Sequence, residues 1–433
     1  MTRRHVIKNH AALSSTALRK DALAVLEAGL RAIDTGAAVR RACRLRGDVF
    51  SIGRRSWNLA KFENVYVIGI GKAAYDSAVA IERVLGRRIS GGVILDVKSG
   101  PLRRMRSYAG THPFPSEINM RATDEIIDLL VRAERKDLVI AVVSGGGSAL
   151  LCRPYKLKCD VLALVTRVLM AKGADINEIN TVRKHLSEVQ GGQLAELAYP
   201  ATVIGLLFSD VPGDNPGIIA SGPTVLDQTT VHDASEILSR YGIVKACRMP
   251  DCDLRETPKD PALFKKIANV LLMTNAVALD AMKAEGLKRG YRVNILTRTL
   301  SGEARDAGAS LARKPRPGEM ILAGGETTVT MRGKGRGGRN QELALGAFAS
   351  VPDDGLVLSC ASDGIDNTPA AGAIVDEITK RRAEAKKLDS ESALANNASY
   401  DFFKATGSQM ISGQTGADVS DLVIAARAKK RSS

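Results

Sequence analysis

The 433-residue sequence has little of what marks several common classes of protein. No apolar run approaches the ~20 residues needed to span a bilayer, and the basic first ten residues lack the apolar stretch of a secretory signal. Six scattered cysteines do not make a disulfide framework. Aromatic residues make up only 4% of the chain, which leaves little material for stacking nucleic-acid bases. These absences predict a soluble cytoplasmic protein with neither a membrane nor a nucleic acid as its partner.

Positive charge is the one feature in excess. The 62 Lys and Arg residues outnumber the 47 Asp and Glu residues, which gives a net charge of +15. Such a balance is typical of many nucleic-acid-binding proteins. Residues 1–61, however, hold 13 basic and 4 acidic side chains, so most of the excess lies in one region. Because no zinc-finger spacing or RNA-recognition signature accompanies it, we expect a solvated surface and keep a basic nucleic-acid-binding module as a remote alternative.

Short apolar runs alternate with helical patterns along most of the chain. A helical stripe covers residues 16–34, and the runs lie at 65–68, 93–95, 138–143, 203–208, 270–273, 293–296, 320–323 and 356–358. Continuous hydrophobicity is typical of strands buried on both faces, so the pattern predicts an α/β fold with largely parallel sheets. We expect two domains, 1–250 and 251–433, since a proline-containing segment interrupts the pattern near 245–262. Cys247 and Cys252 in that segment have no nearby His, so we expect no zinc site there.

Ligands of open α/β sheets bind beyond the carboxyl ends of the strands, so the loops after the runs are the candidate sites. Residues 69–74 fit G-x-G-x-x-A, a strand-to-helix turn that includes Gly71. The turn could hold a dinucleotide, with Asp96 as the ribose-binding acid, or could serve packing alone. In a third interpretation, Lys72 at the start of a helix, among free backbone N–H groups, binds a small anion. We favour this third interpretation.

The loop after the run at 138–143 consists of Ser144, Gly145, Gly146, Gly147 and Ser148. Three glycines between two hydroxyls let backbone amides approach phosphate oxygens closely. The loop lacks the Gly-Lys-Ser/Thr ending of a P-loop and the spacing of a nucleophile elbow. We expect contact with a phosphate or a nucleotide; the alternative is a flexible turn.

The next loop contains two acids four residues apart, Asp210 and Asp214, followed by Asn215. This spacing suits a ligand for a hard cation and a positioning group, although Asp214 could simply cap a turn. A helical pattern at 180–187 carries Arg183 on the face that also holds Asn180 and Ser187, and we interpret that face as part of a site.

The C-terminal half has a loop with Glu326, a glycine-rich basic stretch at 333–339, and Asn340 at a helix start. The stretch that ends in Arg339 is an anion-binding arrangement or a mobile basic linker. Asp363 and Asp366 follow the last run and could bind a metal or form a turn. Several anion-binding loops with several carboxylates favour phosphoryl transfer over acyl transfer.

Ten ordered strings resemble the glycerate 2-kinases of the MOFRL type, the class II glycerate kinases. They lie at residues 69–74, 111–115, 144–150, 180–185, 209–214, 220–224, 324–329, 337–342, 362–366 and 415–418. The resemblance covers roughly residues 17–425. It implies a two-domain α/β kinase with the active site in a cleft between the domains. It also implies transfer of the γ-phosphoryl group of ATP to the 2-hydroxyl of D-glycerate, with Mg²⁺.

The resemblance further implies that Lys72, Asp210 and Arg339 are the catalytic residues. Lys72 would hold the glycerate carboxylate or a transferring oxygen, Arg339 would stabilise charge on the γ-phosphoryl group, and Asp210 would orient the attacking hydroxyl or bind Mg²⁺. We expect substrate or nucleotide contacts from Gly71, Ser144, Gly145, Gly146, Gly147, Ser148, Arg183, Asn215, Glu326 and Asn340. The expected metal ligands are Asp210, Asp214 and Asp363.

An NAD(P)H-dependent hydroxypyruvate reductase is the second functional hypothesis. It shares the substrate chemistry and the G-x-G-x-x-A turn, and members of the family are sometimes labelled that way. It leaves the loops at 144–148 and 333–339 without a role, so we rank it below the kinase. We expect a monomer or a homodimer.

Overall fold

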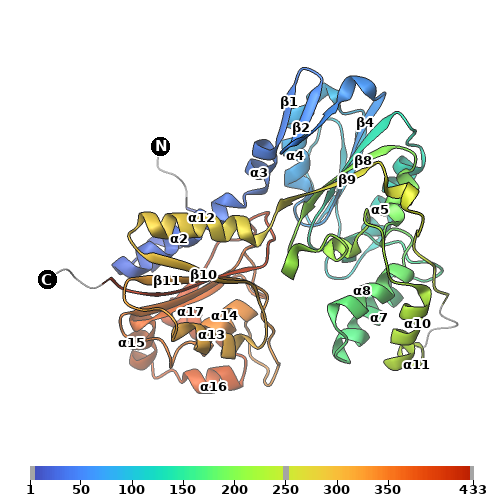
Figure 1. Ribbon diagram of the computed structural model, residues 1–433. Helices are drawn as coiled ribbons and strands as arrows, with labels where there is room; N and C mark the ends of the chain where they lie inside the picture. Colours follow the sequence, from blue (N-terminus) through green and yellow to red (C-terminus); the bar gives the residue numbers. More distant parts are fainter. Residues whose placement is uncertain (1–4, 247–252, 430–433) are drawn as a thin grey trace. The chain divides into compact units, whose positions relative to one another are not determined.

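The chain folds into two compact α/β units (Figure 1). Figure 1 is a computed structural model that describes residues 5–246 and 253–429. The first unit runs from Thr35 to Leu272, and the second combines the chain up to Asp34 with the chain from Met273 onward. The predicted domain boundary lay at 250/251. The segment with Cys247 and Cys252, on which that boundary and the zinc argument rested, lies outside the described residues.

The first unit is built on a six-stranded sheet in the order β6-β5-β4-β7-β8-β9. Its strands are β4 (Asn64–Ile70), β5 (Gly91–Asp96), β6 (Arg106–Ala109), β7 (Asp137–Val143), β8 (Thr202–Phe208) and β9 (Ile267–Met273). The ladders β6–β5, β5–β4, β4–β7 and β7–β8 are parallel. Every residue of β7 is buried, as its continuous hydrophobicity predicted. This sheet aligns the carboxyl ends of the strands that precede the candidate loops.

The first unit also contains helices and an antiparallel meander. The helices are α3 (Thr35–Ala42), α4 (Ala74–Leu85), α5 (Glu117–Val131), α6 (Gly147–Leu150), α7 (Cys159–Ala171), α8 (Ile176–His185), α9 (Gln193–Ala198), α10 (Val231–Arg240) and α11 (Ile243–Ala246). The meander consists of β1 (Cys43–Arg46), β2 (Val49–Ile52) and β3 (Arg55–Asn58). Helices α7, α8 and α10 share a small apolar core of their own.

The second unit contains a six-stranded mixed sheet in the order β10-β11-β15-β12-β13-β14. Its strands are β10 (Arg292–Leu300), β11 (Glu319–Gly325), β12 (Gly355–Ala361), β13 (Gly372–Asp376), β14 (Gln409–Met410) and β15 (Asp421–Arg427). Strands β10 and β11 are parallel, and β15 lies antiparallel between β11 and β12, which therefore run in the same direction. Its helices are α1 (His10–Leu13), α2 (Ala17–Ala32), α12 (Asn275–Lys288), α13 (Ala304–Ala312), α14 (Arg339–Gly346), α15 (Glu377–Ala385), α16 (Ser390–Ala395) and α17 (Ser399–Thr406).

The predicted α/β architecture is confirmed, and all eight predicted strands are present. The helical stripe at 16–34 is α2, which packs on α12 in the second unit. The structure adds strands that were not predicted from the sequence, namely β1–β3, β6 and β13–β15. It also joins Cys152 to Cys159 in a disulfide, a pair that the cysteine spacing did not single out. Among the described residues, no helix combines the length and apolar character that crossing a bilayer requires.

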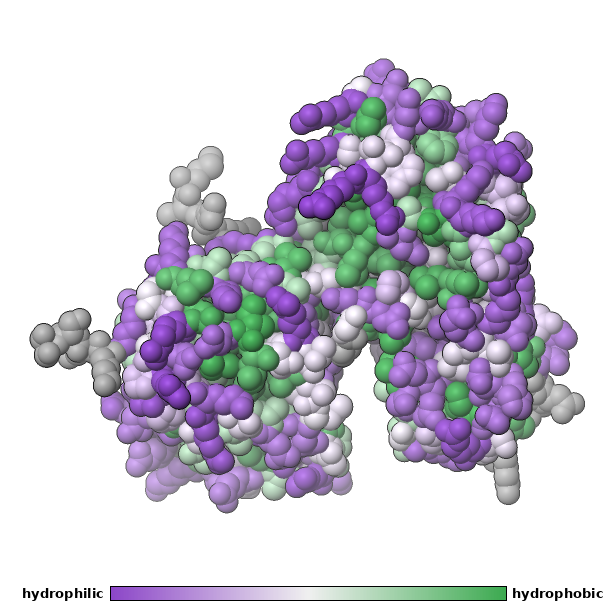
Figure 2. All heavy atoms as spheres, viewed as in Figure 1, coloured by the Kyte–Doolittle hydropathy of each residue, from purple (hydrophilic) through white to green (hydrophobic). Residues whose placement is uncertain are grey.

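The basic excess near the N-terminus is mostly solvated, as expected. The side chains of Arg44, Arg46, Arg54 and Arg55 are exposed on the meander, and Figure 2 shows long hydrophilic side chains at that end of the unit. Arg19 is an exception, since it is fully buried and makes a bidentate pair with Asp376, with distances of 2.6 and 2.7 Å. This buried pair fixes α2 to the second unit.

Candidate active site

The turn between β4 and α4 keeps its backbone donors for the protein itself. The N–H groups of residues 71–75 bond to Leu95 O, Gly145 O, Ser144 Oγ, Gly71 O and Asp96 Oδ2, in that order. The expectation of free N–H groups around Lys72 is therefore wrong, because the neighbouring loop and Asp96 occupy them. Any anion bound here depends on the Lys72 side chain.

Asp96 points into the protein and caps α4. Its carboxylate accepts hydrogen bonds from the N–H groups of Tyr75 at 2.8 Å and Val97 at 2.6 Å, and the residue is fully buried. Burial raises its pKa to about 6, although these hydrogen bonds oppose the shift. Because Asp96 is buried and caps α4, it cannot also bind a ribose hydroxyl. The dinucleotide interpretation therefore lacks both free N–H groups for a pyrophosphate and an acid for the ribose.

Glycines let the loop at 144–148 approach this turn closely. Gly71 has φ +110°, and a Cβ built on it would lie 2.3 Å from Ser144 Oγ. A Cβ on Gly145 would lie 2.3 Å from Asp210 Oδ2. A Cβ on Gly146 would lie 3.2 Å from Lys72 Cγ and 3.3 Å from His112 Cδ2. Asp210 therefore borders Gly145, and Lys72 and His112 border the adjacent Gly146.

The same loop presents open backbone donors. The N–H of Gly147 bonds to Ser144 O, whereas the N–H groups of Gly145 and Gly146 have no acceptor in the part of the chain that the structure describes. Gly146 adopts φ +76°, a left-handed conformation that favours glycine. Successive open N–H groups beside a lysine are a suitable environment for phosphate or carboxylate oxygens.

Ser148 begins a hydrogen-bonded chain that leads to α8. Its Oγ lies 2.8 Å from Ser221 Oγ, which donates to Asn180 Oδ1 at 2.8 Å. Ala220 and Ser221 both have positive φ values, +50° and +60°, which is strained for residues with side chains. Asn180 and Ser221 belong to motifs that the sequence singled out, but neither was among the predicted binding residues.

Arg183 lies beside this chain without an acidic partner. Its guanidinium reaches Ser221 Oγ and Thr166 Oγ1 only at 3.5 Å, and it forms no ion pair among the described residues. Burial lowers its pKa to about 10, so it remains charged at neutral pH. A desolvated cation without a counterion is a strong candidate for binding an anion.

Arg183 also lines an apolar cavity of about 470 Å³ in the first unit. Gly146 and Ser148 lie at this cavity, and Phe114, Leu162 and Met170 supply apolar walls. Cys152 and Cys159, joined by the disulfide, line it as well. Its size and its few polar groups are typical of a site for a small organic ligand.

Two of the three predicted metal ligands, Asp214 and Asp363, lie in turns. Asp214 has φ +54°, and Asn215 Oδ1 accepts the N–H of Gly217 at 2.9 Å, which closes a turn. Asp363 likewise accepts the N–H of Ile365 at 3.0 Å. Within residues 5–246 and 253–429, none of Asp210, Asp214 and Asp363 belongs to a group of three or more metal-ligating side chains.

A second cluster lies in the other unit, where Arg339 begins α14. Its guanidinium bonds to Asp421 at 2.6 and 3.1 Å and to Glu326 at 2.9 Å. Burial opposes the charge of Arg339, but the carboxylates of Asp421 and Glu326 raise its pKa above the ordinary value. Burial raises the pKa of Asp421 to about 7 against the attraction of Arg339. The sequence predicted Arg339 and Glu326 but missed Asp421.

The N-terminus of α14 is capped in the same manner as that of α4. Asp366 accepts the N–H groups of Asn340 at 3.1 Å and Gln341 at 2.9 Å. The Asn340 side chain bridges Asp366 and Asp421, at 3.2 and 2.8 Å. Asp366 therefore forms a helix cap rather than an open metal site, and predicted Asn340 is buried within the network.

The glycine-rich basic stretch is docked rather than mobile. The N–H groups of residues 332–334 bond to the side chains of Asn396 and Asn397, and the Arg336 guanidinium stacks 4.9 Å from the Tyr400 ring centroid. A Cβ on Gly337 would lie 2.0 Å from Ser399 Oγ. The glycines thus allow the stretch to pack against the first residues of α17 and the segment before it.

Parallel-strand loops that carry cations, carboxylates and open amides define an α/β protein that handles small anions. A family model described as "Domain of unknown function (DUF4147)" matches residues 21–250, and that of the MOFRL family matches residues 319–421. The chain belongs to the MOFRL-type glycerate kinases.

Curated relatives agree with this assignment. The chain is 37% identical to the glycerate 2-kinase of Pyrococcus horikoshii, over 96% of this chain and 98% of that one. It is 38% identical to the D-glycerate 2-kinase of Thermotoga maritima, over 84% and 90% of the two chains. A crystal structure of glycerate kinase from Thermotoga maritima matches with a TM-score of 0.82 at 34% identity, covering 95% of this chain and 99% of that one.

Proposed function

We propose that the protein transfers the γ-phosphoryl group of ATP to the 2-hydroxyl of D-glycerate. The observation that carries the proposal is the loop at Gly145 and Gly146, where open N–H groups lie beside Lys72 and Asp210. Phosphoryl transfer depends on positioning and on electrostatic stabilisation, and cationic and backbone donors at one loop supply both.

In this proposal the cations have separate duties. Lys72 binds the glycerate carboxylate or a transferring oxygen at the glycine loop. Arg183, a half-buried cation that forms no ion pair with any residue the structure describes, binds phosphate oxygens at the cavity beside Ser148. Arg339, held by Asp421 and Glu326, stabilises negative charge that develops on the γ-phosphoryl group.

Mg²⁺ fits this arrangement through Asp210. The ion commonly takes one or two protein carboxylates and completes its shell with phosphate oxygens and water, so a single carboxylate beside a phosphate-binding loop is sufficient. When bound, Mg²⁺ would neutralise charge on the phosphate oxygens. Because Asp214 and Asp363 lie in turns, we do not propose them as metal ligands, and we assign the metal to Asp210 alone.

His112 extends the set of residues proposed for the reaction. Its ring borders Gly146 together with Lys72, and it also lies at the cavity. An imidazole in this position can accept the proton that the substrate hydroxyl loses when it attacks the γ-phosphoryl group. Its replacement by Asn or Gln should lower kcat more than it raises KM.

Product identification tests the proposal. Purified protein is incubated with D-glycerate, ATP and Mg²⁺, and ³¹P NMR distinguishes 2-phosphoglycerate from 3-phosphoglycerate. The proposal expects 2-phosphoglycerate, with turnover lost in Lys72→Met. Oxidation of NADH by hydroxypyruvate without ATP turnover would instead restore the reductase hypothesis.

We keep the cytoplasm as the expected compartment and a monomer or homodimer as the expected oligomeric state.

A further inference from the structure

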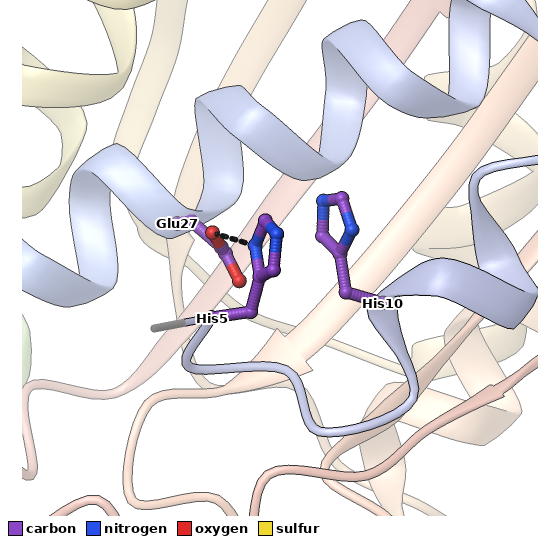
Figure 3. Close-up of side chains that lie close together, drawn as sticks. All are labelled: His5, His10 and Glu27. Carbon is purple, nitrogen blue, oxygen red and sulfur yellow. Dashed lines mark hydrogen bonds and ion pairs between the residues drawn. The ribbon is translucent and has the colours of Figure 1, made fainter. Parts of the chain in front are cut away.

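A cluster of three side chains in the second unit lies apart from every residue used above. His5, His10 and Glu27 each offer one metal-ligating atom, and these atoms lie within 4.8 Å of one another. His5 precedes α1, His10 begins it, and Glu27 comes from α2 (Figure 3). In the described part of the chain, no other three His, Cys, Asp or Glu residues come together in this way.

From this geometry we infer that His5, His10 and Glu27 form a binding site for a divalent transition-metal ion such as Zn²⁺. Two imidazoles and one carboxylate are the donor set that Zn²⁺ takes in many proteins, with water as the fourth ligand. Mg²⁺ prefers oxygen ligands, so this site is distinct from the one proposed at Asp210.

The surroundings orient two of the three ligands. Glu27 is almost fully buried, and its Oε1 accepts the N–H groups of Val6 at 3.0 Å and Ile7 at 3.2 Å. These bonds hold the carboxylate and leave Oε2 toward His5, 2.9 Å from its Nδ1. Ser14 Oγ lies 3.1 Å from His10 Nδ1, which leaves Nε2 of that ring as the ligand. Fixed outer contacts of this kind set the tautomer and orientation of metal ligands.

Binding requires one ring to turn. The His5 and His10 rings, which lie next to each other in Figure 3, are stacked. Their centroids are 3.6 Å apart, and the angle between their planes is 13°. Nitrogen lone pairs lie in the ring plane, so stacked rings do not both point at one ion. The His5 side chain is 51% exposed and can rotate, whereas Glu27 is held in place.

Arg31 is the competitor for this site. Its guanidinium bonds to Glu27 Oε2 at 2.5 Å, one turn along α2. A divalent ion must displace that bond or share the oxygen with it. Because the Arg31 side chain is partly exposed, it can move into solvent, and its removal should strengthen metal binding.

Calorimetric titration of the tag-free full-length protein with Zn²⁺ tests the inference. We expect one equivalent to bind, and we expect His5→Gln and His10→Gln each to weaken that binding at least 10-fold. The matched control is His232→Gln, because His232 and Glu236 form an exposed imidazole–carboxylate pair on α10 without a third ligand. Its binding should equal that of the natural chain.

Two further measurements make the result decisive. Arg31→Gln should bind Zn²⁺ about 10-fold more tightly if the guanidinium competes for Glu27, and the kinase activity of His10→Gln should match the natural chain. Zn²⁺ binding that survives in both histidine variants would overturn the site, as would a natural chain that binds no equivalent. Loss of binding only in His232→Gln would also overturn it.

Discussion

Both units contain a capped helix after a glycine turn, but the residues around the two turns differ. In each, a helix follows a glycine turn, and a buried carboxylate accepts N–H hydrogen bonds from its first turn: Asp96 from Tyr75 in α4, and Asp366 from Asn340 and Gln341 in α14. The cation beside each cap differs in its partners. Lys72 borders the open amides at Gly145 and Gly146, whereas Arg339 is fixed by Asp421 and Glu326.

This difference teaches that a glycine turn before a helix is not in itself an anion site. The positive end of the helix dipole is already used by the cap in both units, so ligand binding falls to side chains and to the separate loop at 144–148. Lys72 lies beside the open amides of that loop, while Arg339 is bound to two carboxylates and serves both stability and the charge of its surroundings. The two cations should therefore respond differently to substitution.

The largest expected effect is on catalysis, at Lys72. Lys72→Met should lower kcat/KM about 10²–10³-fold, because a charged donor at the reacting oxygens is lost. The loss of activity should exceed the loss of unfolding free energy, since the backbone N–H of residue 72 still bonds to Gly145 O. Steady-state kinetics and urea unfolding measure the two quantities. Lys98→Met, which breaks a half-exposed pair with Asp76, is the control; equal activity of the two variants would refute the role of Lys72.

Replacement of Arg339 should lower the stability of the protein as well as its activity. Arg339→Met leaves Asp421 buried without its cation, which should cost about 3 kcal/mol of unfolding free energy in addition to activity. The double variant Arg339→Met, Asp421→Asn removes the unpaired charge and should recover most of the stability but none of the activity. A single variant as stable as the natural chain would show that the pair is not structural.

The sequence predicted the positions of the loops better than their bonding. Continuous apolar runs located eight strands, and Lys72, Asp210 and the glycines of 144–148 do come together, because parallel strands end at one edge of the sheet. The helix caps could not be predicted, since Asp96 and Asp366 lie more than 20 residues along the chain from the helical N–H groups that donate hydrogen bonds to them. Strand β15 was missed although residues 422–426 are continuously apolar, and Asp421 was missed with it.

The cap at α4 predicts a measurable pH dependence. The folded pKa of Asp96 is about 6 and its ordinary value 3.8, so between these values the folded state holds a proton that the unfolded state has released. Asp96 therefore lowers stability as the pH rises through this window, by roughly 3 kcal/mol. Asp96→Asn should remove that fall, so the stability of the variant relative to the natural chain should rise between pH 4 and pH 7.

Urea unfolding at several pH values measures this difference, which is independent of any constant offset from the new amide. Asp76→Asn is the matched control, because it removes a half-buried carboxylate from the same helix, one that pairs with Lys98. Parallel profiles for Asp96→Asn and the natural chain would contradict the buried, charged cap.

The smallest expected effect separates capping from ligand binding within the glycine loop. Ser144 Oγ accepts the N–H of Ala73 at 3.1 Å and is fully buried, so Ser144→Ala should cost about 1–2 kcal/mol of stability and leave KM for ATP unchanged. Ser148 lies at the cavity near Arg183, so Ser148→Ala should raise KM for ATP severalfold with less effect on stability. Although the two serines lie only four residues apart, we therefore expect Ser144→Ala to act mainly on stability and Ser148→Ala mainly on KM for ATP. A raised KM in Ser144→Ala would mean that the cap also contacts the nucleotide, and the separation between capping and binding would then fail in this unit.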